Sequence, residues 1–113
     1  MQPAETPHNE LFSETNDCHA GKPRFDLLPP NALMDIATVM TEAAASGKYG
    51  LREWEEGRPW GTHYAALQRH LQAFWAGQDL DEESALPHLA HAGFRILALL
   101  EYMRTHPELD DRP

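Results

Sequence analysis

Two histidines in the C-terminal half of the chain have a spacing that could support chemistry. His88 and His91 are three positions apart, and Arg95 follows four positions later, so a helix would place all three on one stripe. Two imidazoles at this spacing can hold one divalent cation, or one of them can act as an acid or a base near neutral pH. The alternative, which is commoner for an isolated HxxH pattern, is that the pair only flanks the beginning of a helix.

A cluster of acidic residues stands just before these histidines. Asp79, Asp81, Glu82 and Glu83 lie within five positions of the chain. Clustered carboxylates suit hard cations such as Mg²⁺ or Mn²⁺. Acidic residues are also favoured at a helix N-terminus, where Ser84 could serve as a cap, so part of the cluster has an explanation without a metal.

Further candidates lie in the middle of the chain. His63 and His70 are seven positions apart and would share one face of a helix, with Arg69 adjacent. A single histidine on a helix is usually packed or solvated. His70 gains importance only if this helix neighbours the one that carries His88 and His91.

Cationic and aromatic residues gather in the segments that are rich in proline and glycine. Lysine and arginine can hold phosphate, and tryptophan or tyrosine can stack on a base. The alternative is that the tryptophans close one end of a small core. The residues concerned are Lys22, Arg24, Lys48, Tyr49, Arg52, Trp54, Arg58 and Trp60.

The elements that must position these side chains are expected to be helices. Apolar residues recur with helical spacing and none alternate with period two, so the sequence predicts an all-α fold, a small bundle of three main helices. The expected helices span about 31–46, 62–76 and 85–105. Thr62 is the expected N-cap of the second, and Gly47, Gly77 and Pro107 are expected to stop the three.

Each expected helix carries an apolar stripe that we expect to face the core. The first stripe is Leu33, Ile36, Ala37, Met40 and Ala44, and the second is Tyr64, Leu67, Leu71, Phe74 and Trp75. The third is Leu89, Ile96, Leu97, Leu100 and Met103.

One domain over 21–106 accounts for the patterned part of the chain. Residues 1–20 are polar and aperiodic, which predicts a mobile arm, and residues 107–113 are expected to form a frayed tail. Glycines, a proline and two tryptophans predict a loop over 47–61, a length that is often functional. Three helices leave a small core, so we expect a homo-oligomer to complete it.

Composition excludes several classes of protein. The 113 residues carry a formal charge of −9, which disfavours binding to a nucleic acid polymer or an anionic membrane. The single cysteine, Cys18, excludes an intramolecular disulfide and zinc sites built from several cysteines. No apolar run approaches membrane length and no signal peptide is visible, so we expect a cytoplasmic protein. The motifs GxxxxGK[ST], GxSxG and HExxH are missing.

Several strings together resemble a known family. GKPRFDLLPP, KYG followed by a tryptophan, Arg69-His70-Leu71 and DLDEESALPHLAHA are similar to a phage and prophage family of dATP/dGTP diphosphohydrolase-like proteins. That family is grouped with the MazG-like all-α nucleoside triphosphate pyrophosphohydrolases, and the resemblance covers about 21–104. It implies a helical, oligomeric enzyme that converts a (deoxy)purine nucleoside triphosphate to the monophosphate and pyrophosphate with Mg²⁺ or Mn²⁺, in the bacterial host cytosol if the protein is phage-encoded.

The positions that match the family suggest roles for individual residues. The resemblance implies metal ligands at Asp79, Asp81, Glu83, His88 and His91. Catalytic roles, including that of a general base, would fall to Glu83, His88, His91 and His70. Substrate would be bound by Lys22, Arg24, Lys48, Tyr49, Trp54, Arg69 and Arg95.

Three positions depart from the family pattern. Glu53 replaces the usual asparagine before Trp54, Ala85 replaces the usual glycine after Ser84, and Arg95 replaces an asparagine four residues beyond the second histidine. HxxH also stands where MazG-like enzymes carry an acidic motif. Two alternatives therefore stay open: a non-catalytic phage protein that sequesters a nucleotide or a nucleotide-derived signal, and a small helical protein-interaction module.

Overall fold

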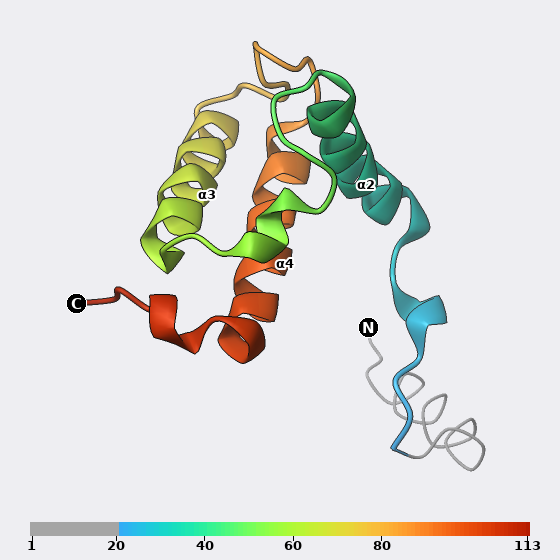
Figure 1. Ribbon diagram of the computed structural model, residues 1–113. Helices are drawn as coiled ribbons and strands as arrows, with labels where there is room; N and C mark the ends of the chain where they lie inside the picture. Colours follow the sequence, from blue (N-terminus) through green and yellow to red (C-terminus); the bar gives the residue numbers. More distant parts are fainter. Residues whose placement is uncertain (1–20) are drawn as a thin grey trace.

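The computed structural model describes residues 21–113 and consists of helices joined by loops (Figure 1). The long helices are α2 (Pro30–Ala45), α3 (Trp60–Trp75) and α4 (His88–Thr105), and the short 3-10 turns are η1 (Phe25–Leu27), η2 (Glu53–Glu56) and η3 (Pro107–Leu109). Within 21–113 the one β contact is an isolated bridge between Leu80 and Pro87. The predicted all-α bundle of three main helices is confirmed. The predicted arm over 1–20, with Cys18, lies outside the described residues.

Proline and glycine set the ends of the helices. Each long helix begins directly after a proline at its N-cap, and the glycines that follow α2 and α3 have φ angles of 78° and 100°, the left-handed conformation that ends a helix. The helix α3 therefore begins at Trp60, and Thr62 is not its cap. The helix α4 begins at His88 rather than at residue 85, because the Leu80–Pro87 bridge and the φ of 62° at Ala85 hold the preceding residues in a loop.

The helix α4 contacts both of the other long helices (Figure 1). Three alanines of α4 are buried, and small side chains let helices approach closely. At Gly93 an added Cβ would lie 2.6 Å from Cδ1 of Ile36, so glycine is what lets α2 approach α4 here. The buried apolar residues are Val39, Trp60, Ala66, Leu67, Ala90, Ala92, Ala98 and Tyr102.

The predicted core stripe of the third helix is wrong. Its five large residues, Leu89, Ile96, Leu97, Leu100 and Met103, are 43–61% exposed. Side-chain contacts with α3 are made instead by Tyr102 and His88, and the long aliphatic side chains lie on the outside. On α3, Leu67 is buried as predicted, but Tyr64 and Trp75 are exposed, as is Leu33 on α2.

The C-terminal residues, for which the sequence predicts a frayed tail, make specific contacts with the start of α3 (Figure 1). The indole Nε1 of Trp60 donates to the His106 carbonyl at 3.0 Å, and the Gly61 N–H donates to Asp111 Oδ1 at 2.8 Å. The guanidinium of Arg112 lies 4.8 Å from the Trp60 ring centroid. Of the helices in the described part, none is both long enough and apolar enough to cross a bilayer.

Candidate functional site

A cavity of about 780 Å³ lies between the loop after α2 and the helices α3 and α4. Figure 1 shows this loop passing in front of α4. Its wall is formed by the end of α2, the loop 46–59, one face of α3, the connector before α4 and the first half of α4. This volume is within the range typical of small-molecule sites. The loop predicted over 47–61 thus supplies one side of this cavity.

Three histidines meet at one end of this cavity: His70 and His91 line it, and His88 lies buried behind them. Nδ1 of His70 lies 2.9 Å from Nδ1 of His88, and the ring of His70 stacks on that of His91 with centroids 4.6 Å apart. His70 comes from α3 and the other two from α4, so the packing of these helices brings the residues together. The sequence assigns His70 a role only if these two helices are neighbours. The structure meets this condition.

The surroundings of the cluster keep the imidazoles of His70 and His91 neutral. Burial, together with the nearby His91 and His88, lowers the pKa of His70 to about 4. Burial also lowers the pKa of His91. Neutral imidazoles offer lone pairs, which is the form that binds a metal or accepts a proton at pH 7.

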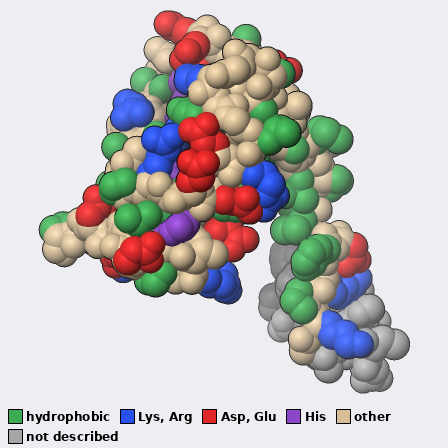
Figure 2. All heavy atoms as spheres, viewed as in Figure 1, with side chains coloured by type: hydrophobic (Ala, Val, Ile, Leu, Met, Phe, Trp, Pro, Cys, Tyr) green, Lys and Arg blue, Asp and Glu red, His purple; other side chains and the backbone are tan. Residues whose placement is uncertain are grey.

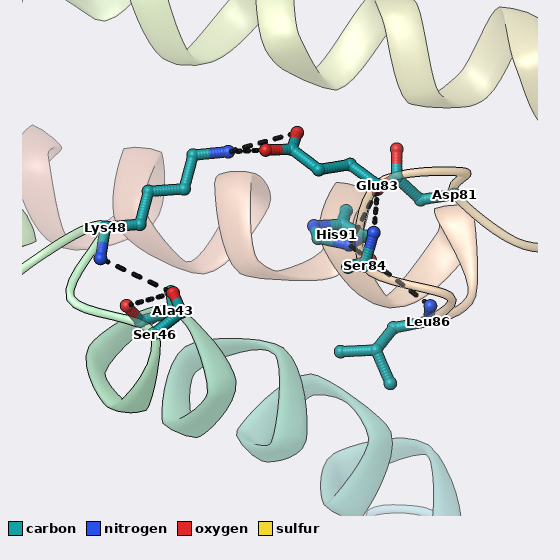
Figure 3. Close-up of polar contacts among 8 residues, drawn as sticks. All are labelled: Ala43, Ser46, Lys48, Asp81, Glu83, Ser84, Leu86 and His91. Carbon is teal, nitrogen blue, oxygen red and sulfur yellow. Dashed lines mark hydrogen bonds and ion pairs between the residues drawn. The ribbon is translucent and has the colours of Figure 1, made fainter.

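The connector before α4 adds a carboxylate to the cluster. The N–H of Ser84 donates to Asp81 Oδ2 at 2.9 Å, and the Leu86 N–H donates to Ser84 Oγ at 3.2 Å (Figure 3). Ser84 Oγ also lies 2.8 Å from His91 Nε2, and Asp81 Oδ2 lies 4.0 Å from the same nitrogen. Burial opposes ionisation of Asp81, but the hydrogen bonds from Ser84 outweigh it and hold the pKa of the carboxyl below its usual range.

His70, Asp81 and His88 could hold a metal ion. One ligand atom from each lies within 4.8 Å of the others. A separation of 2.9 Å between two nitrogens is close to that of adjacent ligands on one ion, about 3 Å for metal–nitrogen bonds of about 2.1 Å. The buried Nε2 of His88 has no hydrogen-bond partner among residues 21–113, so nothing there fixes its tautomer. The residues present therefore fit a divalent cation.

Cations line the rest of the cavity, with glutamates among them. Lys48, after α2, and Glu83, in the connector, point toward one another, with Lys48 Nζ 3.3 Å from both carboxylate oxygens (Figure 3). Arg58, Arg69 and Arg95 also line the wall. Figure 2 shows Lys and Arg side chains interleaved with Asp and Glu on the face in view, with histidine visible between them. The cavity thus places a group of side chains that could hold a metal beside several cations.

The structure separates the roles of the two tryptophans. Trp60 is buried in the core, whereas Trp54, on η2, lines the cavity together with Tyr49. Trp54 has Arg52 over its ring, at 5.4 Å from the centroid. The residue that could stack on a base is therefore Trp54 or Tyr49, and not Trp60.

Four residues with predicted roles do not line the cavity. Lys22 and Arg24 lie on the segment that leads into α2, and Arg24 pairs with Asp26 at 2.7 Å. The side chain of Asp79 is exposed and lies outside the lining, while its carbonyl accepts the His88 N–H at 2.9 Å. His88 is buried behind the cavity wall rather than on its surface.

Two residues near the site were not assigned a role from the sequence. His63 and Tyr102 are buried, with His63 Nε2 3.1 Å from the Tyr102 hydroxyl. His63 Nδ1 lies 2.9 Å from Arg95 Nη1. The available signal was the seven-residue spacing that puts His63 on the same face of α3 as His70.

The fold and the site define a class: a small all-α protein whose polar cavity joins a histidine–carboxylate cluster to several cations. The profile of the family "dATP/dGTP diphosphohydrolase, N-terminal" matches residues 13–112, and the chain belongs to this family. A curated relative, the "dATP/dGTP diphosphohydrolase" of Salmonella phage PMBT28, is 29% identical over 92 residues, which are 81% of this chain and 31% of that relative. The chain thus spans about a third of the length of this relative. No solved structure matches the chain.

Proposed function

We propose that this chain binds dATP or dGTP in the cavity and hydrolyses it to the monophosphate and pyrophosphate. The observation that carries the proposal is the shared cavity: the group His70, Asp81 and His88 stands beside a wall that carries Lys48 and Arg95. A triphosphate needs both features, since its charge must be neutralised while a water molecule attacks. Family membership and the name of the phage relative support the same substrate class.

The proposed cofactor is a divalent cation held by His70, Asp81 and His88. Two nitrogens and one carboxylate suit Mn²⁺ better than Mg²⁺, because Mg²⁺ prefers oxygen ligands and keeps several waters. When bound, the ion would neutralise phosphate charge and activate water. Asp79 is not part of this proposed ligand set, since its side chain lies outside the cavity.

His91 is the proposed general base. It lines the cavity, its lowered pKa keeps it neutral, and Ser84 Oγ at 2.8 Å orients its Nε2. Glu83 is the proposed partner that holds Lys48 at the cavity wall until phosphate replaces it. Because this ion pair is exposed, exchanging one anion for another costs little.

The remaining lining residues are proposed to bind the nucleotide. Lys48, Arg69 and Arg95 would contact phosphate oxygens, and arginine can do so in a bidentate way. Trp54 or Tyr49 would stack on the purine. Lys22 and Arg24 could contribute only from a different position of their segment or from a second copy of the chain.

We also propose that the protein is a homo-oligomer. The exposed apolar residues of α4 form a row at spacings of three, four and seven, which is the pattern of a helix-packing surface. A second copy covering this row would enlarge a small core. Analytical ultracentrifugation tests this, and a monomer at micromolar concentration that Leu100→Glu leaves unchanged would contradict it.

The test of the function is incubation of the purified chain with each dNTP and NTP and with Mn²⁺ or Mg²⁺, followed by chromatography. We expect dATP or dGTP to yield the monophosphate and pyrophosphate, and His91→Ala to stop the reaction while the fold is retained. Full activity of His91→Ala would remove its role as general base.

Sequestration is the second candidate, favoured by Arg95, a cation where the resemblance expects asparagine. It predicts tight binding with the nucleotide recovered intact. If neither nucleotide nor metal changes the melting temperature, the chain is better explained as an interaction module.

A further inference from the structure

Arg95 occupies an unusual position for a cation in this chain. It lies half-buried on α4 and lines the cavity, and no hydrogen bond or ion pair found within 21–113 joins it to a carboxylate. Other arginines in the same range do have such partners: Arg58 pairs with Glu53 at 3.0 Å, and Arg112 pairs with Asp110 at 2.7 Å. In a chain with twice as many acidic as basic residues, a half-buried arginine without a carboxylate partner leaves its charge available to an external anion.

Besides its interaction with the Tyr49 side chain, Arg95 is held by a series of hydrogen bonds whose directions follow from chemistry. The Tyr102 hydroxyl donates its one proton to the Trp54 carbonyl at 2.6 Å, because a carbonyl can only accept. The hydroxyl oxygen must therefore accept from Nε2–H of His63 at 3.1 Å. Arg95 Nη1 can only donate, so Nδ1 of His63 accepts from it at 2.9 Å. Every donor and acceptor in this series of hydrogen bonds has a partner only when His63 is neutral and protonated on Nε2.

The surroundings favour this single arrangement. His63 is 1% exposed and Tyr102 is 0% exposed, so water does not compete for their polar atoms. Burial, with the charges of Arg95 and Arg58, lowers the pKa of His63 to about 4. Burial also raises the pKa of Tyr102, so the hydroxyl keeps the proton that it donates to Trp54. The ring of His63 is further enclosed by that of Phe94, with centroids 6.0 Å apart and edge to face.

We propose that His63 is a positioning residue that holds the Arg95 guanidinium as the receptor for a phosphoryl group of the substrate. The inference rests on the proposed function, since it takes the cavity to bind a nucleotide. The series of hydrogen bonds also begins at the backbone of Trp54, so it links the aromatic end of the cavity to Arg95. A guanidinium that is already ordered loses less side-chain freedom when the anion arrives.

The first test measures the binding of inorganic pyrophosphate and, separately, of Mn²⁺ to the full chain by calorimetry. We expect Arg95→Gln and His63→Phe each to weaken pyrophosphate binding about ten- to a hundredfold, the range for a hydrogen bond to a charged group. The affinity of the double variant for pyrophosphate should lie within about twofold of that of Arg95→Gln, because both changes remove the same interaction. Mn²⁺ affinity should not change.

A conservative variant distinguishes a role of His63 in positioning Arg95 from a role in packing alone. His63→Gln offers an oxygen to Arg95 and an N–H to Tyr102, and we expect it to restore most of the pyrophosphate affinity that His63→Phe loses. The inference is overturned if His63→Phe binds pyrophosphate as the wild type does. It is also overturned if the loss of affinity in the double variant is the product of the losses in the two single variants.

A measurement on the wild-type protein tests the inference even if the variants do not fold. The ¹⁵N chemical shifts of His63 at pH 7 should show Nε2 protonated and Nδ1 bearing a lone pair. An Nδ1–H tautomer or a charged ring would overturn the inference. If the wild type binds neither pyrophosphate nor any dNTP, the proposed function fails as well, whereas binding that Arg95→Gln does not weaken leaves the function standing and removes only the role of His63.

Discussion

The Nδ1 atoms of His70 and His88 lie 2.9 Å apart although the residues belong to different helices and are 18 positions apart in the chain. The contact exists only when α3 and α4 are packed together. A ligand that binds both nitrogens therefore binds the folded state alone and stabilises it by mass action. Folding and metal binding should be coupled in this protein.

The first prediction is that Mn²⁺ raises the melting temperature. At a concentration of 100 times Kd the ion should add about 2.7 kcal/mol to the free energy of unfolding. Asp81→Asn and His88→Ala should each remove the effect, as measured by thermal unfolding with and without the ion. Glu82→Gln is the matched control, because this exposed neighbour of Asp81 lies outside the cavity and the proposed ligand group. An equal loss in Glu82→Gln would indicate nonspecific binding to the acidic connector.

The second prediction concerns Lys48. Its ion pair with Glu83 is exposed, and such pairs contribute about 0–1 kcal/mol, so Lys48→Gln should hardly change the free energy of unfolding. The same change should raise the Kd for dATP or dGTP by roughly fivefold to tenfold, because one charged contact with phosphate is lost. Titration calorimetry measures the Kd, and urea unfolding measures stability.

Arg104→Gln serves as the control for Lys48. Arg104 is an exposed cation on the last turn of α4 and does not line the cavity. The control should bind nucleotide as the wild type does. A loss of affinity as large as that of Lys48→Gln would mean that the charge of the whole chain, and not the cavity wall, controls binding.

The helices could be predicted from the sequence because their ends are marked locally. Pro30, Gly47, Gly77 and Pro107 act through their own backbone conformation, so no tertiary information is needed to place them. The helix α4 begins three residues after its predicted start, because the bridge between Leu80 and Pro87 is a tertiary contact. The exposure of the apolar row on α4 does not follow from the sequence, because helical spacing identifies an apolar stripe but not what covers it.

The site could be predicted only in part. His88, His91 and Asp81 were found because they are close in the sequence, and spacing carries that information. The contact of His70 with His88 depends on how α3 packs on α4. The sequence therefore predicts it only for the case that these two helices are neighbours. The role that we propose for His63 depends on Tyr102 and on the Trp54 carbonyl, which are 39 and nine positions away, and no local pattern joins them.

The third prediction concerns Ala85, whose φ of 62° is in the left-handed region. A side chain in this conformation costs about 1–2 kcal/mol, and glycine avoids that cost but loses about 0.5–1 kcal/mol through the greater freedom of the unfolded chain. Ala85→Gly should therefore raise the free energy of unfolding by roughly 0.5–1 kcal/mol, measured by urea unfolding. The control is Ala76→Gly, at a φ of −81°, which should destabilise. Stabilisation by both changes would contradict the argument from φ.

The last prediction follows from His63. Its pKa is about 4 in the folded protein, below the ordinary value of 6.5, so the unfolded chain binds the proton more tightly. Its contribution to stability is complete above pH 6.5 and is lost as the pH falls from 6.5 toward 4. The full shift corresponds to about 3 kcal/mol, since one pKa unit is about 1.4 kcal/mol.

His63→Gln isolates this contribution, because glutamine does not titrate and His70, with its own lowered pKa, stays in place. The free energy of unfolding of the wild type should fall more steeply between pH 6.5 and 4.5 than that of the variant, and the two curves should run parallel above pH 7. Urea unfolding at half-unit steps of pH measures both. Parallel curves throughout would mean that His63 titrates normally in the folded state, which the hydrogen bond from Arg95 to its Nδ1 does not allow.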